Sequence, residues 1–105
     1  MKLYVLVRKD LSFIQQAVQA GHAIASYLRE HKTLWDNGTL VFLGLKNERA
    51  LDKWSSILKN ESVNHSIFYE PDVDSNTSMA FTYDPSDNKP FKKKMDKDLS
   101  ILRME

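Results

Sequence analysis

Apolar residues along this chain form four short runs, separated by two longer segments of helical periodicity. The short runs are rich in β-branched and aromatic residues, which is typical of strands. These runs are residues 3–7, 39–45, 63–69 and 79–83. In residues 12–31 and 48–59, apolar positions recur at spacings of three and four, which is typical of amphipathic helices. The pattern predicts the order β-α-β-α-β-β.

The connections between these elements predict how the strands pair. The first two apolar runs alternate little, as expected for strands that are covered on both faces. Two crossover helices favour right-handed βαβ units with parallel strands. Residues 70–78 are too few for another crossover helix, so we expect the fourth strand to run antiparallel to a neighbour. The prediction is one α/β domain over residues 1–105, a single-layer, four-stranded mixed sheet with helices packed on its faces.

The segment 12–31, SFIQQAVQAGHAIASYLREH, is the longest expected helix. Ser12 and Gln15 have the spacing of a capping box. Its expected buried face consists of Phe13, Ala17, Ala20, Ile24 and Leu28. Its polar stripe consists of Gln15, Gln19, His22 and Ser26. A glycine inside a helix costs roughly 1 kcal/mol relative to alanine, so Gly21 indicates either close approach to the sheet or room for a ligand.

The last part of the chain is expected to add little to the core. Residues 86–90 are read as an exposed linker. A basic run of lysines follows: Lys92, Lys93, Lys94 and Lys97. Asp96 and Asp98 interrupt this run, which favours a solvated face over a phosphate-binding one. The short apolar segment 99–102 is expected to dock on the sheet edge or against a helix.

Composition excludes several classes of function. With 15 Lys and Arg against 14 Asp and Glu, the net charge is +1, so any nucleic-acid binding must come from a local patch. The absence of cysteine excludes disulfides, thiolate nucleophiles and cysteine zinc sites. The first apolar run is too short for a signal peptide or a membrane span. We therefore expect a cytoplasmic protein without a membrane partner.

The sequence gives no support for a metal or a cofactor. Residues 72–83 begin like a calcium loop, but Thr77 stands at the glycine position and Tyr83 at the glutamate position. His22, His31 and His65 lack close ligand spacing. A glycine-rich phosphate loop is also missing. We therefore expect no metal and no cofactor.

Two sets of polar residues are candidates for a site. In one interpretation, Gln19 and His22 are polar groups that line a substrate cleft. The alternative is a solvated stripe. Glu70, Asp72 and Asp74 follow the third expected strand, and in α/β sheets ligands gather outside the carboxyl ends of strands. The alternative for these carboxylates is a solvated acidic loop.

Two stretches resemble the peptidyl-tRNA hydrolase type II family. They are LYVLVRKDL at the start of the chain and QAGHAIASYL in the first helix. Gln19, His22, Ala23 and Tyr27 match the family's helix motif in type and spacing. The remainder of the chain matches the family in the order and length of its elements. The resemblance implies the family's fold and hydrolysis of the ester between a peptide and its tRNA.

The resemblance also implies roles for individual residues. The family uses a lysine in the first helix, an aspartate after the third strand and threonines before the fourth. The expected catalytic residues are His22, Asp72 and Lys9. The expected substrate-binding residues are Gln15, Gln19, Arg8, Thr77 and Ser78. The family's lysine is replaced here by Gln15, and a neutral amide cannot supply the charge of an ammonium.

Three functions therefore remain open. The chain is an active peptidyl-tRNA hydrolase in which Lys9 substitutes for the missing lysine, with tRNA or peptidyl-tRNA as its partner. Alternatively, it is a binding or regulatory homologue that lost the activity, or a hydrolase of another small ester or amide. In the first case Arg8, Lys9 and Lys92–Lys94 would contact the tRNA backbone. A homodimer is compatible with the sequence.

Overall fold

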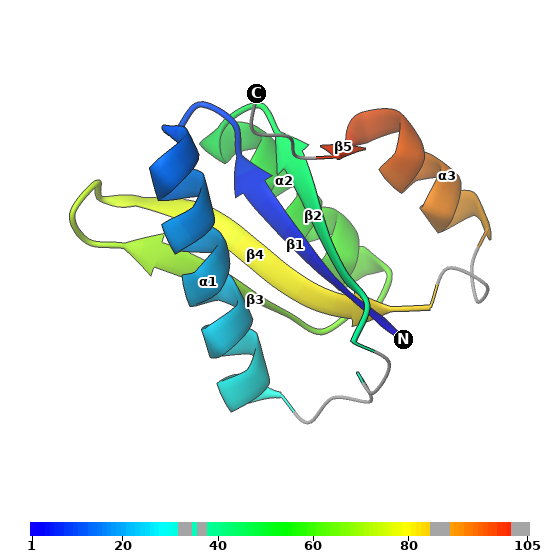
Figure 1. The fold of residues 1–105 in the computed structure, drawn as a ribbon. Coiled ribbons are helices and arrows are strands. Elements are labelled where there is room, and N and C mark those ends of the chain that lie inside the picture. The colour runs from blue at the N-terminus through cyan, green and yellow to red at the C-terminus, as the bar shows by residue number, and fades with distance from the viewer. Residues whose placement is uncertain (32–34, 36–37, 85–88, 102–105) are drawn as a thin grey trace.

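The computed structural model describes residues 1–31, 35, 38–84 and 89–101. Helix α1 lies over one face of a twisted mixed sheet, and α2 and α3 lie over the other (Figure 1). The elements are β1 (Lys2–Arg8), α1 (Phe13–Glu30), β2 (Leu40–Leu45), α2 (Glu48–Asn60), β3 (His65–Glu70), β4 (Ser75–Tyr83), α3 (Lys89–Asp98) and β5 (Ser100–Ile101). Within these ranges, no helix is both long enough and apolar enough to cross a bilayer.

The strands lie in the order β3-β4-β1-β2-β5. β1 pairs in parallel with β2, and β4 runs antiparallel to both β1 and β3. The four expected strands, their mixed arrangement and the helices on the sheet faces are thus confirmed. The short β5 extends the sheet, because Ser100 pairs with Gly44 and Ile101 with Leu43 in antiparallel register. The expected docking of the C-terminal apolar segment on the sheet edge is confirmed for these residues, and residue 102 lies outside the described ranges.

The alternation of side chains along β1 builds two cores, one on each face of the sheet. Tyr4 and Leu6 enter the larger core with Leu51, Trp54 and Leu58 of α2. The smaller core, on the other face, consists of Leu3, Val5, Val7, Ala20, Ala23, Tyr27 and Ala80. Because both faces are covered, β1 is apolar without interruption, as its sequence suggested.

The expected buried face of α1 is confirmed for Ala20, with Ile24 partly buried beside it, and is wrong for Phe13, Ala17 and Leu28. Ser12 does cap the helix, since its side chain accepts a hydrogen bond from the Gln15 backbone N–H. The helix nevertheless buries a different set of residues: Gln16, Gln19, Ala20, Ala23, Ser26 and Tyr27. Phe13 and Leu28 remain 45% and 43% exposed. Small residues let the helix approach the strands, and Gln19 and Tyr27 find partners there, the latter through its Oη with Thr82 Oγ1 at 2.7 Å.

Gly21 also differs from expectation. It lies on the exposed side of α1, and a Cβ built there would meet nothing within 4 Å. Close approach to the sheet therefore does not explain this glycine. Its place in the middle of a helix has no packing reason within one chain.

The C-terminal part contains a helix that the sequence did not indicate. Residues 85–88 lie outside the described ranges, but Lys89 and Pro90 begin α3 and are not part of a linker. Phe91 and Met95 are buried one turn apart in the larger core. On the outer side, Lys92 pairs with Asp96 and Lys94 with Asp98. The basic run thus lies mostly exposed on the outer side of α3, and Asp96 and Asp98, which interrupt it, are the ion-pair partners of two of its lysines.

Candidate functional site

Most of the residues expected to form a site lie at one edge of the sheet. β1, β2 and β3 point in the same direction, because β4 runs antiparallel to both β1 and β3. Arg8, Leu45 and Glu70 therefore end their strands at the same edge. The start of β4 and the first half of α1 complete this region (Figure 1). It is the edge where ligands of α/β sheets commonly bind.

A β-bulge near the start of β4 turns two consecutive side chains toward α1. Phe68 pairs with Ser78 and Tyr69 with Asn76, so Thr77 is left without a partner in β3. Thr77 Oγ1 donates to Gln19 Oε1 over 2.7 Å. Ser78 Oγ donates to the main-chain oxygen of Gln19 over 2.6 Å. The bulge thus gives α1 two adjacent anchors on one strand.

Gln19 has a partner for each polar atom of its side chain. Its Nε2 donates to Gln15 Oε1 over 3.2 Å and to Glu70 Oε1 over 3.0 Å. Its Oε1 accepts the Thr77 bond, and the residue is only 1% exposed. Gln15, Gln19 and Thr77, three expected substrate-binding residues, are therefore brought together. They bond to one another in a closed network that holds α1 on β3 and β4, and Gln15 alone of the three is exposed.

His22 lies one turn further along α1. Its ring stacks on Phe68 of β3, with the ring centroids 4.3 Å apart and the planes 4° from parallel. His22 itself is exposed. The histidine is therefore fixed in orientation by an aromatic neighbour, and an accessible imidazole lies beside the Gln19 network.

Asp72 lies at the tip of the β3–β4 hairpin. Residues 71–74 form the turn, and all four are exposed. Tyr69 Oη donates to Asp74 Oδ1 at the base of this turn. Among the described residues, Asp72 makes no hydrogen bond or ion pair with another side chain. The structure therefore forms no contact between Asp72 and His22.

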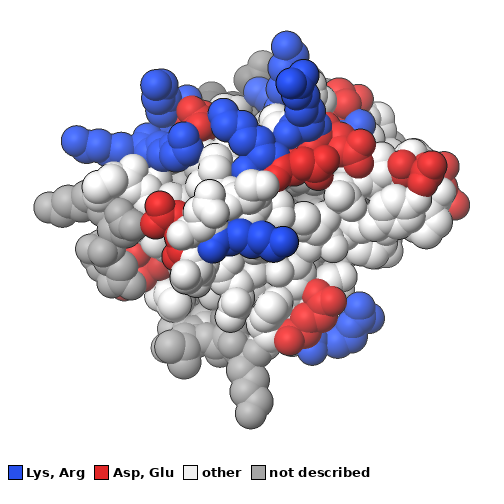
Figure 2. Space-filling model, turned by 180° about the vertical axis from the view of Figure 1, so that it is seen from behind, with Lys and Arg blue, Asp and Glu red and all other residues white. Residues whose placement is uncertain are grey.

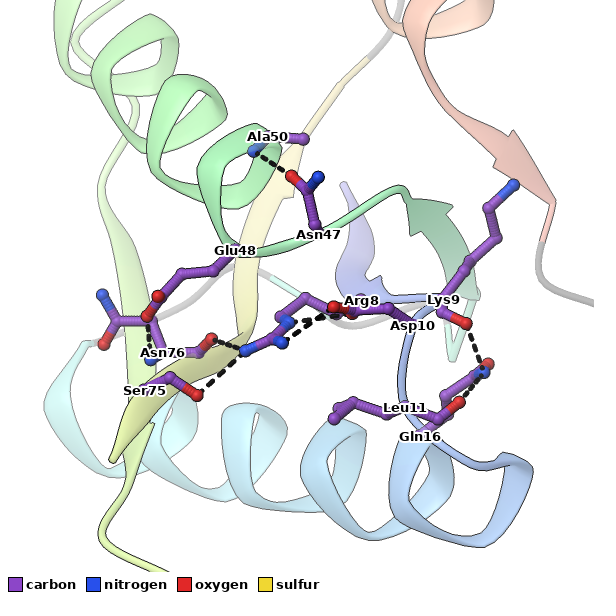
Figure 3. A network of polar contacts seen from close by, with 10 residues as sticks. All are labelled: Arg8, Lys9, Asp10, Leu11, Gln16, Asn47, Glu48, Ala50, Ser75 and Asn76. Atoms are coloured by element: carbon purple, nitrogen blue, oxygen red, sulfur yellow. Dashed lines mark hydrogen bonds and ion pairs between the residues drawn. The ribbon is translucent and has the colours of Figure 1, made fainter. Parts of the chain in front are cut away.

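Arg8 is a structural bridge at the end of β1 (Figure 3). Its guanidinium forms two bonds of 2.9 Å with the Asp10 carboxylate. It also donates to Ser75 Oγ over 2.9 Å and to the main-chain oxygen of Asn76 over 3.1 Å. The bond to Arg8 lowers the pKa of Asp10 below its usual value. Arg8 thus joins β1 to the start of β4, and its donors are largely occupied.

The same cluster extends to the first turn of α2. Glu48 Oε2 accepts a hydrogen bond from the Asn76 backbone N–H over 2.6 Å, and Asn76 Nδ2 donates to Asp52 Oδ1 over 3.3 Å. Figure 3 shows Glu48, Asn76 and Ser75 side by side next to the Arg8 guanidinium. Glu48 was not among the candidate residues. It is distant from β4 in the sequence, so no sequence pattern indicated this contact.

Lys9 points away from this cluster. Its Nζ donates to Ser100 Oγ of β5 over 3.2 Å, and Figure 3 shows its side chain extending from the Arg8 cluster toward β5. Its main-chain N–H donates to the Leu45 oxygen over 2.7 Å. The structure therefore does not bring Lys9 together with His22 and residues 70–78, where it would have to replace the family's lysine.

Exposed basic residues gather elsewhere on the molecule. Lys9 and Lys46 directly follow Arg8 and Leu45, which are aligned in the parallel register of β1 and β2. Figure 2 shows Lys and Arg side chains grouped along one side of the rear face, with acidic side chains interspersed. Directly after β1 and β2, in the first turn of α2 and on α3, the exposed Lys and Arg without a carboxylate partner among the described residues are Lys9, Lys46, Arg49, Lys93 and Lys97, here called the basic surface. The parallel register was the only signal in the sequence for part of this surface.

Two cavities lie away from the candidate site. One, of about 320 Å³, lies between α3 and the sheet and is lined by residues that include Tyr4, Leu43 and Met95. The other, of about 310 Å³, is lined by residues that include His31 and His65. Within the described part of the chain, no group of three or more His, Asp or Glu side chains is placed to hold a metal ion.

Comparison of the sequence with models of protein families and with curated proteins finds no match.

Proposed function

We propose that this protein is a peptidyl-tRNA hydrolase-like domain that binds tRNA or peptidyl-tRNA and does not hydrolyse the ester. The first strand and the helix motif Gln19, His22, Ala23 and Tyr27 support the relationship to that family. The observation that carries the loss of activity is the closed network of Gln15, Gln19 and Thr77. This role would place the protein in the cytoplasm.

The network argues against catalysis because ester hydrolysis needs free donors or a cation aimed at the developing oxyanion. Removing one such preorganised group typically costs about 2.7–4 kcal/mol of barrier. Here the Gln19 amide hydrogens bond to Gln15 and Glu70, and Lys9 Nζ bonds to Ser100. His22 is accessible, but no cationic group contacts it among the described residues. An exposed imidazole that stacks on Phe68 suits contact with a base or a sugar better than proton transfer.

The basic surface supports the binding half of the proposal. With a net charge of +1, the molecule has no general attraction to RNA, so binding depends on where its charges lie. Lys9 and Lys46 are exposed directly after the aligned ends of β1 and β2, and Arg49 is exposed in the first turn of α2. Phosphate contacts release counterions, so RNA affinity should fall steeply as salt rises.

A titration with fluorescently labelled tRNA tests the binding. We expect a Lys46→Glu/Arg49→Glu variant to bind at least tenfold more weakly than the wild type, with a shallower dependence on salt. Lys59→Glu is the matched control, because Lys59 is an exposed lysine in the last turn of α2, at the opposite end of that helix. Equal binding by both variants, or no binding by the wild type, would contradict the proposal.

A hydrolysis assay with peptidyl-tRNA tests the missing activity separately. We expect no turnover when the enzyme is substoichiometric to the substrate. Turnover that His22→Ala abolishes would instead establish an active hydrolase. Turnover that is unchanged in His22→Ala and Asp72→Ala would place the chemistry outside the expected site. Neither result would alter the outcome of the binding titration.

A further inference from the structure

Helix α1 presents an apolar face to solvent. Ile14 is 73% exposed, Val18 45% and Leu28 43%. Gly21 and Ala25 lie between them and are exposed as well. These residues recur at spacings of three and four, so they form one continuous stripe along the side of the helix that is opposite to the sheet.

The outer side of this helix is unusually apolar for a surface helix. Its buried side mixes Gln16, Gln19 and Ser26 with Ala20, Ala23 and Tyr27, while its outer side includes the exposed Ile14, Val18 and Leu28. Between Phe13 and Leu28 the sequence contains no charged residue, although 28% of the whole chain is charged. A contiguous apolar patch without charges is typical of an interaction surface.

We propose that this face binds the same face of a second copy of the chain, with the two α1 helices antiparallel and crossing at Gly21. Ile14 and Leu28 lie seven residues to either side of that position, and the exposed Ala17 and Ala25 lie four residues to either side. In this arrangement Ile14 would meet the partner's Leu28, and Ala17 would meet the partner's Ala25. Large side chains would thus meet large ones at both ends and small ones would meet at the centre, as a self-complementary two-fold interface requires.

A crossing of two helices at Gly21 explains this glycine, which has no packing role within a single chain. A glycine inside a helix costs roughly 1 kcal/mol relative to alanine, and a Cβ at Gly21 would meet nothing within 4 Å in the monomer. At the crossing point of two helices, however, the missing side chain lets the backbones approach. The exposed Ala17 and Ala25, one turn to either side, extend the narrow region.

The charges at the ends of the two α1 helices are also complementary in this arrangement. The first turn of α1 contains no acidic residue that would balance the positive end of its dipole. In the antiparallel arrangement, Glu30 would lie beside the first turn of the partner. Arg29 would lie beside the partner's Phe13, where the guanidinium could stack on the exposed ring. Charge complementarity therefore favours a second copy in this orientation.

One pair of helices crossing in this way covers less surface than the about 1,600 Å² of a standard protein interface. We therefore expect dimerisation in the micromolar range of concentration. The inference does not rest on the basic surface, since Lys46, Arg49 and its other members do not belong to the stripe, although His22 lies beside it.

Disulfide trapping is a direct test, because the chain has no cysteine of its own. We expect Gly21→Cys to form a disulfide-linked dimer on mild oxidation. A mixture of Ala17→Cys and Ala25→Cys chains should form the mixed dimer in preference to either homodimer. Ser56→Cys, at an exposed position of α2, is the matched control and should remain monomeric.

A charge swap tests the two-fold symmetry in solution. Gly21→Lys and Gly21→Glu would each place like charges against each other at the crossing, so each should sediment as a monomer. Mixed in equal amounts, they should form a heterodimer. The substituted side chains meet open space in the monomer, so folding should be retained, and circular dichroism verifies it.

Several results would overturn the proposal. One is a wild-type chain that sediments as a monomer at the highest concentrations attainable. Another is a Gly21→Cys variant that cross-links no faster than Ser56→Cys. Flotation of a monomeric wild type with phosphatidylcholine vesicles, abolished by Ile14→Lys, would assign the face to a lipid surface and not to a second copy.

Discussion

Thr77 donates its hydroxyl hydrogen to the side-chain oxygen of Gln19 over 2.7 Å, and both residues are buried. This bond connects β4 to α1 at the centre of the region where a substrate was expected. Replacing Gln19 by leucine would leave the hydroxyl and the Glu70 carboxylate without this partner. We expect a loss of about 1–3 kcal/mol in the free energy of unfolding, measured by urea denaturation.

Gln15→Ala is the control for this substitution, because Gln15 is exposed and contributes one acceptor to the network. It should change the free energy of unfolding by less than about 0.5 kcal/mol. If Gln19→Leu lowered the free energy of unfolding as little as Gln15→Ala does, the network would not be what holds α1 on the sheet.

The contribution of the hydroxyl itself can be isolated with Thr77→Val, which removes the donor and retains the shape. Alone it should cost about 1 kcal/mol of unfolding free energy. In the Gln19→Leu background it should cost much less, since its main acceptor is already gone. A double-mutant cycle of urea midpoints measures this coupling. Additive effects would mean that the two side chains do not stabilise each other.

The bond between Arg8 and Asp10 predicts a dependence of stability on pH. The pKa of Asp10 is lowered in the folded protein, chiefly by the bond to Arg8. Its contribution is therefore complete above the unfolded pKa of about 3.9 and disappears as the pH falls through the folded value. Because the Asp10 side chain is 40% exposed, the contribution should be at most about 1 kcal/mol.

Asp10→Asn tests this dependence with urea denaturation at a series of pH values. The variant should be less stable than the wild type at neutral pH, and the difference should shrink once the pH falls below about 4. If the difference in the free energy of unfolding between variant and wild type stayed constant at every acidic pH tested, the charge of Asp10 would not be the cause of that difference.

Glu48 should protect a single backbone amide of β4. Its carboxylate accepts the Asn76 N–H over 2.6 Å, so Glu48→Ala leaves that donor without its acceptor. We expect hydrogen exchange of the Asn76 amide to become about five- to thirtyfold faster, which corresponds to a bond of about 1–2 kcal/mol. Asp52→Ala removes the neighbouring contact with Asn76 Nδ2 and should leave the exchange of this amide nearly unchanged.

Gly21→Ala should stabilise the single chain. The added methyl group meets no other atom within 4 Å, and alanine favours the helix by about 0.8–1.0 kcal/mol. Thermal unfolding at low micromolar concentration, where the monomer should dominate, measures this gain. A lower melting temperature at that concentration would mean that Gly21 has a role within the monomer.

The sequence predicted the elements better than it predicted which of their sides are buried. Continuous apolar runs and helical spacing were sufficient for β1 to β4, α1 and α2. The buried face of α1 was misjudged because Phe13 and Leu28 weighed more in the pattern than Gln16 and Gln19. Gln19 is buried because Glu70 and Thr77 of the strands, distant in the sequence, offer it hydrogen-bond partners. Gln16 bonds to the main-chain oxygens of Lys9 and Leu11, just before the helix.

Helix α3 was missed for a related reason. Only Phe91 and Met95 of its residues enter the core, too few for a visible helical period among so many lysines. In the candidate region, the proximity of Gln19 to residues 70–78 followed from the order of the elements. The positions of Arg8, Lys9 and Glu48 did not, because they depend on side-chain bonds to Ser75, Ser100 and Asn76.

The position of β1 has a consequence for the way the chain folds. β1 precedes the other described strands in the sequence, yet it lies in the interior of the sheet, between β2 and β4. Lys2 pairs with Tyr83, so one side of β1 stays open until nearly the whole domain has left the ribosome. Contacts so distant in sequence slow folding. A nascent chain that ends before β4 would therefore expose an apolar strand edge, and this is the stage at which a chaperone would be needed most.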